Sequence, residues 1–129
     1  MKMKETKYFI CEKCGNLAEL ILASGVSMVC CGQKMTPLQA GAVEASHEKH
    51  IPVVSFNNEG VYVSVGSVIH PMSKEHSILW ISLETDRGIY RRELSPDAAP
   101  EANFRLEDGE RAVRAYAYCN LHGLWKKDV

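Results

Sequence analysis

The sequence predicts a mainly β protein, in which a small cysteine-rich lobe precedes a larger antiparallel sandwich or barrel. Apolar and polar residues alternate in Val61–Val65 and Val113–Cys119, as expected of strands with one buried face. Turn signals separate further short β-rich runs, and no sustained 3.6-residue apolar pattern occurs in the 129 residues. Helix should therefore be scarce, and this length suits one main domain with a small appendage.

Each expected strand is bounded by residues that favour turns. The other β-rich runs are Val53–Phe56, Ile78–Leu83 and Ile89–Leu94, and the turn segments are Asn57–Gly60, Asp86–Gly88 and the proline-bounded Ser95–Pro100. The alternation in Val113–Cys119 places Cys119 on the face of Ala115 and Ala117, so its sulfur should point into the sandwich. We expect this strand to be the last.

The charge balance and the N-terminus exclude several classes of protein. Lys and Arg total 15 against 16 Asp and Glu, a net charge of −1, which gives no basic face for nucleic acid. The polar start, Met1–Lys7, does not look like a signal peptide. No run reaches the roughly 18 apolar residues of a spanning helix, so we expect no membrane partner and a cytoplasmic protein.

Five cysteines and five histidines are the unusual counts. An odd number of cysteines cannot pair off within one chain, so metal ligation is the leading interpretation. Four cysteines lie before residue 37, whereas Cys119 and all five histidines lie after it, which implies two separate ligand sets. With Thr36–Ser46 as the connector, we expect a four-cysteine domain over residues 1–37 and a β-sandwich domain over residues 38–129.

The first ligand set consists of Cys11, Cys14, Cys30 and Cys31. Two intervening residues let Cys11 and Cys14 reach one metal, and Gly15 supports the tight turn that this needs. Adjacent residues of a strand point to opposite faces, so a bend aided by Gly32 is required at Cys30 and Cys31. Four thiolates suit both zinc and iron, with zinc slightly favoured on the cysteines alone, and a strained disulfide between Cys30 and Cys31 is a poor third.

The second candidate set is His50, His70, His76, Cys119 and His122. It is not a zinc-protease helix, because His47 and His50 are three residues apart and Pro52 pushes Ile51 out of helical geometry. Any one of these histidines could be incidental, but a buried thiolate among imidazoles needs a cation. Iron, zinc and copper all suit such ligands, and more than four candidates argue against a closed zinc site, which favours redox iron.

The chain resembles desulfoferrodoxin, the two-iron form of superoxide reductase, over nearly its whole length. The resemblance is carried by both cysteine pairs and by four further segments, Glu48–Pro52, Val65–Met72, Ala99–Ala102 and Cys119–Gly123. It implies a desulforedoxin-like four-cysteine iron lobe followed by an immunoglobulin-like sandwich that holds the catalytic iron. This reverses the preference for zinc at the first site and implies one-electron reduction of superoxide to hydrogen peroxide.

The resemblance also implies a role for each residue of the second set. The expected iron ligands are four equatorial imidazoles and one axial thiolate, with the sixth position open: His50, His70, His76, His122 and Cys119. Lys49 would draw in superoxide and help to deliver protons, and Glu48 would occupy the sixth position once the iron is ferric. Backbone N–H groups of Leu121 and His122 would hydrogen-bond the Cys119 sulfur.

Three further expectations concern partners and rival functions. The resemblance implies a rubredoxin-like electron donor and a homodimer. The rivals are a non-catalytic iron electron carrier and, less favoured, a zinc-ribbon regulatory protein. His47 departs from the expected pattern, and we interpret it as a solvent-facing addition.

Overall fold

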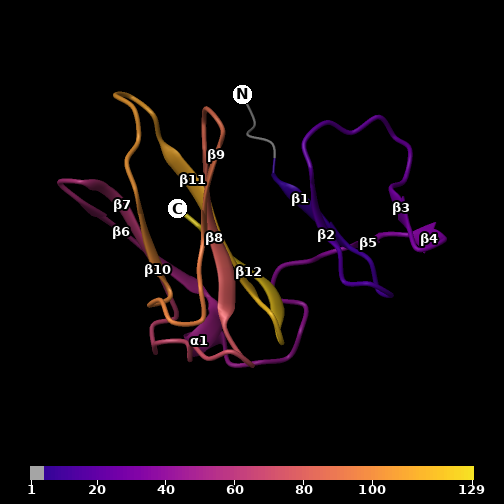
Figure 1. Ribbon diagram of the computed structural model, residues 1–129. Coiled ribbons are helices and arrows are strands. Elements are labelled where there is room, and N and C mark those ends of the chain that lie inside the picture. Colours follow the sequence, from indigo (N-terminus) through magenta and orange to yellow (C-terminus); the bar gives the residue numbers. More distant parts are fainter. Residues whose placement is uncertain (1–4) are drawn as a thin grey trace. The chain divides into compact units, whose positions relative to one another are not determined.

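The computed structural model describes residues 5–129, so the first four residues of the polar N-terminal stretch lie outside it. The chain divides into two compact units, one ending at Gln39 and the other spanning Ala40–Val129 (Figure 1). The backbone N–H of Leu38 bonds to the Tyr8 carbonyl within the first unit, and that of Gly41 bonds to the Leu124 carbonyl within the second. Leu38 and Gly41 both lie within the expected connector Thr36–Ser46, so the segment that links the two units is shorter than expected.

The first unit consists of short antiparallel strands around the cysteines. They are β1 (Lys7–Ile10), β2 (Leu17–Leu20), β3 (Val29–Cys30), β4 (Gln33–Lys34) and β5 (Thr36–Pro37). One sheet has the order β2-β1-β5, and β3 pairs with β4 in a separate hairpin.

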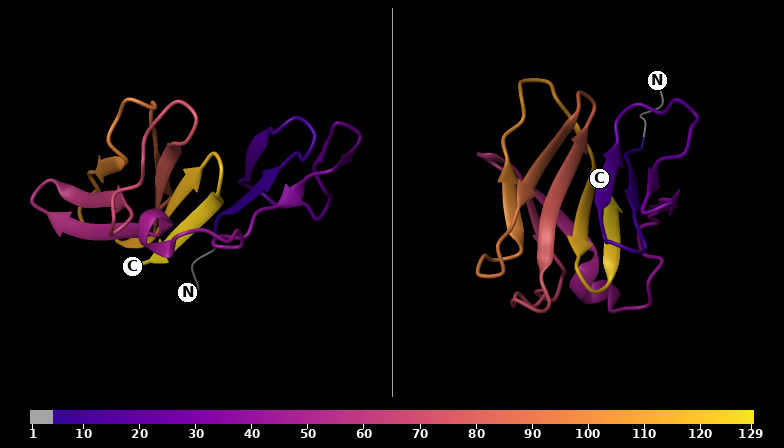
Figure 2. Two further views of the ribbon diagram at one scale, coloured as in Figure 1. Left: turned by 90° about the horizontal axis from the view of Figure 1, so that it is seen from below. Right: turned by 45° about the vertical axis from the view of Figure 1, so that its right-hand side comes forward.

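The second unit is a β-sandwich, as predicted. Its elements are α1 (His47–His50), β6 (Pro52–Asn57), β7 (Gly60–Val65), β8 (Ile78–Thr85), β9 (Ile89–Glu93), β10 (Glu101–Phe104), β11 (Ala112–Cys119) and β12 (Gly123–Asp128). Two sheets, β10-β7-β6 and β12-β11-β8-β9, pack their apolar faces together (Figures 1 and 2). No helix among the described residues is long and apolar enough to cross a membrane.

The alternation in the sequence correctly identifies the core face of two strands. Val61, Val63 and Val65 are buried, whereas Tyr62 and Ser64 between them are partly exposed. In β11 the core face carries Ala115, Ala117 and Cys119, all fully buried. The mainly β fold class is therefore confirmed.

Two strands of the second unit were not expected from the sequence. Cys119 does not end the last strand, because β12 follows the turn and pairs with β11 from Gly123 onward. The segment Cys119–Gly123 forms this turn, and Gly123 has the positive φ of +78° that a tight turn requires. The second unexpected strand is β10, four residues that pair with β7 directly after the proline-bounded loop.

The topology gathers five chain segments at one end of the sandwich. Pro52 at the start of β6 lies opposite Val65 at the end of β7, and Cys119 at the end of β11 lies opposite Ile78 and Gly123. Helix α1 lies at this same end, toward the bottom of Figure 1. Residues immediately before or after these strand ends are therefore brought together, although they are far apart in the sequence.

Candidate metal centres

Cys11 and Cys14 lie on a tight turn after β1. The N–H of Gly15 donates to the Cys11 carbonyl at 2.8 Å, and the N–H of Cys14 points at the Cys11 sulfur at 3.5 Å. Gly15 has a φ of +82°, a conformation that costs glycine little. The turn therefore presents both sulfurs on the same side, as the spacing predicts.

The adjacent pair Cys30 and Cys31 reaches the same point through a bend. Cys31 has a φ of 52°, the one positive value among the described non-glycine residues, and Gly32 follows at 75°. This left-handed turn between β3 and β4 directs both side chains toward the first pair. The four sulfurs lie within 4.8 Å of one another, and all four residues are free thiols, so the structure gives no support for a disulfide between Cys30 and Cys31.

The four thiols affect one another's acidity. The backbone N–H of Cys14 holds the pKa of Cys11 down at about 6, which favours a thiolate there. Hydrogen bonds to the other sulfurs, that of Cys14 first, raise the pKa of Cys31 to about 12. The four thiols therefore cannot all ionise unless a cation compensates their negative charge. Four converging sulfurs are a donor set that fits zinc or iron.

The second cluster forms at the end of the sandwich where the five segments meet. His50 closes α1, His70 follows β7 and His76 precedes β8. Cys119 is the last residue of β11, and His122 lies in the turn to β12. Ile51 after the helix is extended, with φ −70° and ψ 125°, as expected of a residue that precedes proline.

The four imidazoles are arranged as a near-square. Ring centroids of neighbours are separated by 4.7 Å (His50 and His70), 4.6 Å (His70 and His76), 5.1 Å (His76 and His122) and 4.8 Å (His122 and His50). The diagonal from His50 to His76 is 6.4 Å, and neighbouring rings are tilted by 78° to 89°. One ligand atom from each of His50, His76, Cys119 and His122 falls within 4.8 Å of the others. The fourth imidazole, that of His70, joins through its Nε2 atom, which is 3.2 Å from Nε2 of His50.

The nitrogen atoms at the centre cannot all be satisfied by hydrogen bonds. His50 Nδ1 is 2.7 Å from the Ser46 carbonyl and His70 Nδ1 is 2.6 Å from the Pro71 carbonyl, so both Nδ1 atoms donate a proton. In the neutral rings the two Nε2 atoms therefore direct lone pairs at each other. Nε2 of His76 is buried and has no hydrogen-bond partner among the described residues. A cation between these atoms removes the repulsion and satisfies the orphaned nitrogen.

Distances and acidities fit a metal ion at this point. Two metal–imidazole bonds of about 2.1 Å at right angles put their nitrogens about 3 Å apart, and Nε2 of His50 is 3.1 Å from Nδ1 of His122. Burial lowers the pKa of His70 to about 4 and lowers those of His50 and His76, which keeps the rings neutral as ligands must be. Burial raises the pKa of Cys119, although N–H groups of Leu121 and His122 act in the opposite sense, so its thiolate needs the cation.

Glu48 and Lys49 lie on α1 beside His50, both exposed. The positive charge of Lys49 contributes to the lowered pKa of His50 and of His76, so it acts at the cluster. The Glu48 carbonyl accepts hydrogen bonds from the N–H of Val68 at 3.0 Å and from the Ser67 hydroxyl at 3.3 Å. The loop after β7 therefore holds the backbone that carries both charges.

One residue that contacts this cluster was missed in the sequence. Trp125, in β12, is 2% exposed, and its ring stacks on that of His50. The sequence offered one signal for this contact, an aromatic residue three positions after His122. An aromatic residue at this position is equally ordinary for a strand that enters a core, so the signal was not specific. His47 is exposed, as expected, and its ring also lies against the edge of the same indole, with ring centroids 5.5 Å apart.

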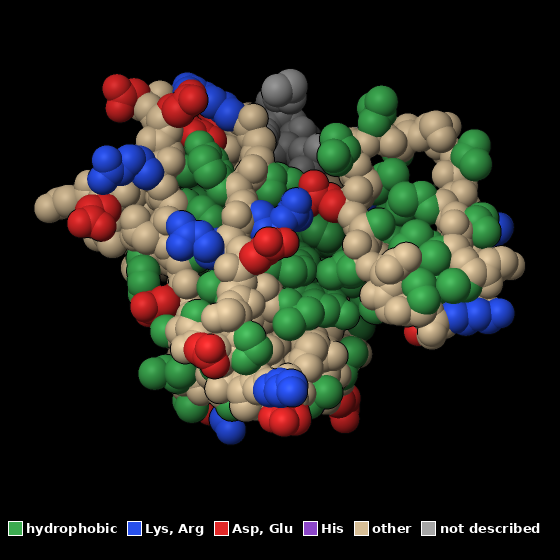
Figure 3. Space-filling model, in the orientation of Figure 1, with side chains coloured by type: hydrophobic (Ala, Val, Ile, Leu, Met, Phe, Trp, Pro, Cys, Tyr) green, Lys and Arg blue, Asp and Glu red, His purple; other side chains and the backbone are tan. Residues whose placement is uncertain are grey.

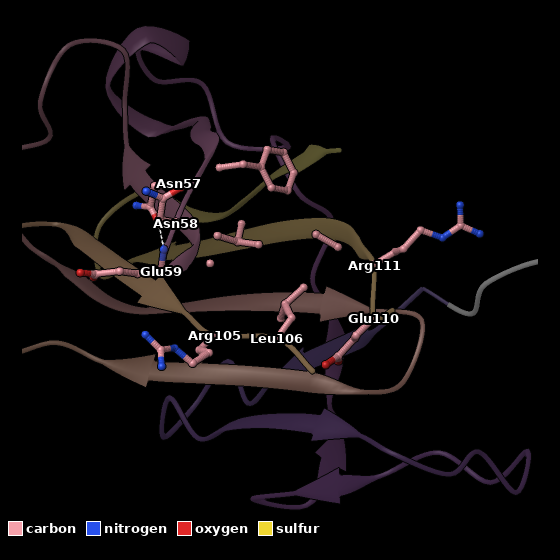
Figure 4. Close-up of a pocket in the computed structure, with 11 residues that line it drawn as sticks. Asn57, Asn58, Glu59, Arg105, Leu106, Glu110 and Arg111 are labelled. Carbon is pink, nitrogen blue, oxygen red and sulfur yellow. Dashed lines mark hydrogen bonds between the residues drawn. The ribbon is translucent and has the colours of Figure 1, made fainter. Parts of the chain in front are cut away.

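A hollow of about 650 Å³ lies elsewhere in the second unit, at the β6–β7 turn and the β10–β11 loop (Figure 4). Asn57, Arg105 and Glu110 are among its lining residues, and it shares none with the histidine cluster. Its Glu110 carboxylate is already bonded to Thr85 and Tyr90. The donor chemistry, and not the presence of a hollow, therefore identifies the functional site.

Comparisons with known proteins agree with both centres. The family model for desulfoferrodoxin matches residues 42–128, and that for the desulfoferrodoxin N-terminal domain matches residues 3–38. A desulfoferrodoxin of Syntrophotalea carbinolica is 44% identical over 97% of this chain and 98% of its own.

Solved structures give the same result for the fold. The crystal structure of the superoxide reductase from Treponema pallidum has 39% identity and a TM-score of 0.81, covering 97% of this chain and all of that one (100%). A superoxide reductase from Giardia intestinalis, described as 1Fe-SOR, has 30% identity and a TM-score of 0.56 over 64% of this chain and 97% of its own. With family models that match both of its units, and a relative that it matches over nearly the whole of both chains, the chain belongs to the desulfoferrodoxin family.

Proposed function

We propose that this protein is a two-iron superoxide reductase, which uses one electron and two protons to convert superoxide to hydrogen peroxide. The observation that carries the proposal is the near-square of four imidazoles beside the buried thiol of Cys119. Relatives and solved structures named superoxide reductase support the activity. Bound ferrous iron supplies the single electron.

The ligands divide between the units. Residues 1–37 form the four-cysteine iron domain, whose centre takes part in electron transfer through Cys11, Cys14, Cys30 and Cys31. Residues 38–129 form the catalytic domain, whose iron ligands are His50, His70, His76, His122 and Cys119. In this assignment the ring nitrogen of His122 that faces the centre is Nδ1, whereas His50 and His70 use Nε2.

The backbone of the catalytic domain fixes the orientation of two histidine ligands and moderates the electron donation of the Cys119 sulfur. Hydrogen bonds from the Nδ1 atoms of His50 and His70 to backbone carbonyls orient their rings and fix the tautomer. N–H groups of Leu121 and His122 stabilise negative charge on the Cys119 sulfur and so moderate its electron donation. Because these partners belong to the backbone, the arrangement exists before substrate arrives.

Lys49 and Glu48 act at the exposed side of the centre. Acidic and basic side chains are intermixed over the sandwich in Figure 3, and the net charge is −1, so the molecule as a whole does not attract an anion. A local ammonium group therefore matters: Lys49 draws superoxide in and helps to deliver protons through water. Glu48, on the same turn of helix, would offer a carboxylate ligand to ferric iron.

The remaining proposals concern partners and location. A rubredoxin-like protein donates the electrons, and the chain forms a homodimer in the cytoplasm. Four apolar side chains of the first unit, at least 64% exposed, support a protein contact there: Ile21, Leu22, Val26 and Val29. The free state of all five cysteines is consistent with a reducing compartment.

Pulse radiolysis tests the activity. Superoxide generated in a solution of the reduced, iron-loaded protein should disappear in a rapid bimolecular reaction, with one hydrogen peroxide formed per superoxide. The control is Cys119→Ser, which retains the four-cysteine centre. If wild type and this variant consume superoxide equally slowly, the protein is the non-catalytic electron carrier instead.

A further inference from the structure

Trp125 contacts two of the proposed iron ligands. Its ring stacks on the imidazole of His50, with centroids 4.9 Å apart and planes 29° from parallel. Its Nε1–H donates to the backbone carbonyl of His122 at 3.0 Å. One buried side chain thus touches ligands that are 72 residues apart in the sequence and belong to different elements.

The stacking contact restrains a motion of the His50 ring that the ring's hydrogen bond does not restrain. The hydrogen bond from Nδ1 to the Ser46 carbonyl fixes one edge of the ring, but the ring can still pivot about that edge. An aromatic surface against the face of the imidazole prevents this pivot. The direction of Nε2, which faces His70 and His122, then depends on the indole.

The hydrogen bond from the indole restrains the other side of the site. It holds the carbonyl of His122 in the turn between β11 and β12. The same turn supplies the N–H groups of Leu121 and His122 that stabilise charge on the Cys119 sulfur. Loss of the indole N–H would loosen the turn, weaken these bonds and leave more electron density on the sulfur.

We propose that Trp125 is a positioning residue of the catalytic centre, with its ring face setting the direction of His50 and its N–H setting the hydrogen bonding of the Cys119 sulfur. This inference rests on the proposed ligand set, but not on the identity of the substrate. The two contacts are separable by substitution. Trp125→Phe retains an aromatic face and removes the N–H, whereas Trp125→Leu removes both.

Cobalt binding provides a readout that does not depend on enzyme activity. Metal-free protein is titrated with Co²⁺, and the spectrum of Cys119→Ser is subtracted, which leaves the band that depends on Cys119. In Trp125→Phe this band should move to longer wavelength and the dissociation constant should rise roughly tenfold. In Trp125→Leu the dissociation constant should rise roughly 100-fold, at the upper end of what partners of metal ligands contribute.

The matched control is Trp80→Phe, the same chemical change at the other tryptophan of the chain, which stacks on Tyr118. It should leave the cobalt band and affinity unchanged. If Trp125→Phe also leaves both unchanged and only lowers the melting temperature, Trp125 is an ordinary core residue and the inference is wrong. Trp125→Tyr, which also lacks the indole N–H, repeats the test if the phenylalanine variant does not fold. If wild type lacks a Cys119-dependent band, the ligand set itself fails.

Discussion

Gly66 has no Cβ atom, which allows the loop after β7 to approach α1 closely, and we expect that no other residue can replace it. It has a φ of +86°, and a Cβ atom there would lie 2.3 Å from the Val68 carbonyl oxygen and 2.6 Å from that of Glu48. These are backbone atoms, which cannot move aside as a flexible side chain can. Gly66→Ala must therefore displace the loop from the helix and break the hydrogen bond from Val68 N–H to the Glu48 carbonyl.

The size of the effect follows from two contributions. The left-handed conformation costs a residue with a Cβ about 1–2 kcal/mol. Loss of the backbone hydrogen bond adds about 0.5–1.5 kcal/mol. We expect Gly66→Ala to lower the free energy of unfolding by about 1.5–3.5 kcal/mol in all.

A second glycine separates the two contributions. Gly109 has a similar φ of +81°, but a Cβ there would meet just the end of the Arg87 side chain, at 3.4 Å. Gly109→Ala should therefore show the conformational cost alone. Urea unfolding of metal-free protein, followed by tryptophan fluorescence, suits the comparison because Trp80 and Trp125 both lie in the second unit.

The comparison has a second readout at the site. Displacement of the loop also shifts the backbone of Glu48 and Lys49, so Gly66→Ala should slow the reaction with superoxide, and Gly109→Ala should not. Equal stability of the two variants would refute the clash with the helix. Equal rates would refute the view that this loop positions Lys49.

Four further predictions concern the centres and the loops. Purified protein from iron-replete expression should contain roughly two irons per chain by elemental analysis, and zinc in the first centre would contradict the electron-transfer role. Cys119→Ser should remove the thiolate-to-iron absorption and most activity; an unchanged spectrum would show that Cys119 is not a ligand. Lys49→Ala should slow the superoxide reaction and flatten its dependence on ionic strength, whereas Lys74→Ala, which removes the same charge, should change neither. The pKa of Glu110 is lowered by the Thr85 hydroxyl first and then by the Glu107 N–H. Its stabilising effect is therefore present above pH 4.5 and lost at more acid pH, and Glu110→Gln should reduce the acid sensitivity of urea unfolding.

The sequence predicted the local features that one or two residues determine. The bend at Cys30 and Cys31 follows from the need to bring adjacent cysteines to one point, and the structure makes it through positive φ at Cys31 and Gly32. The extended conformation of Ile51 follows from Pro52. Burial of Cys119 follows from alternation with Ala115 and Ala117.

Features that depend on packing between elements were not predictable in this way. Tyr116 and Tyr118 occupy the outward positions of β11, yet they are only 2% and 9% exposed. Part of the reason is the Trp80 ring, which stacks on Tyr118 from the neighbouring strand. Alternation identifies which face a residue is on, but not what covers that face.

The near-square of imidazoles is a property of the strand register. His70, His76 and His122 lie in loops, and each follows or precedes a strand whose end is fixed by its pairing partner. The register of β11 shifts between Tyr118 and Cys119, so Cys119 pairs with Ile78 after Tyr118 pairs with Trp80. A slip of one residue would turn the Cys119 sulfur to the opposite face of the sheet. The ligand types can therefore be read from the sequence, whereas their common centre exists only because two sheets hold five strand ends in register.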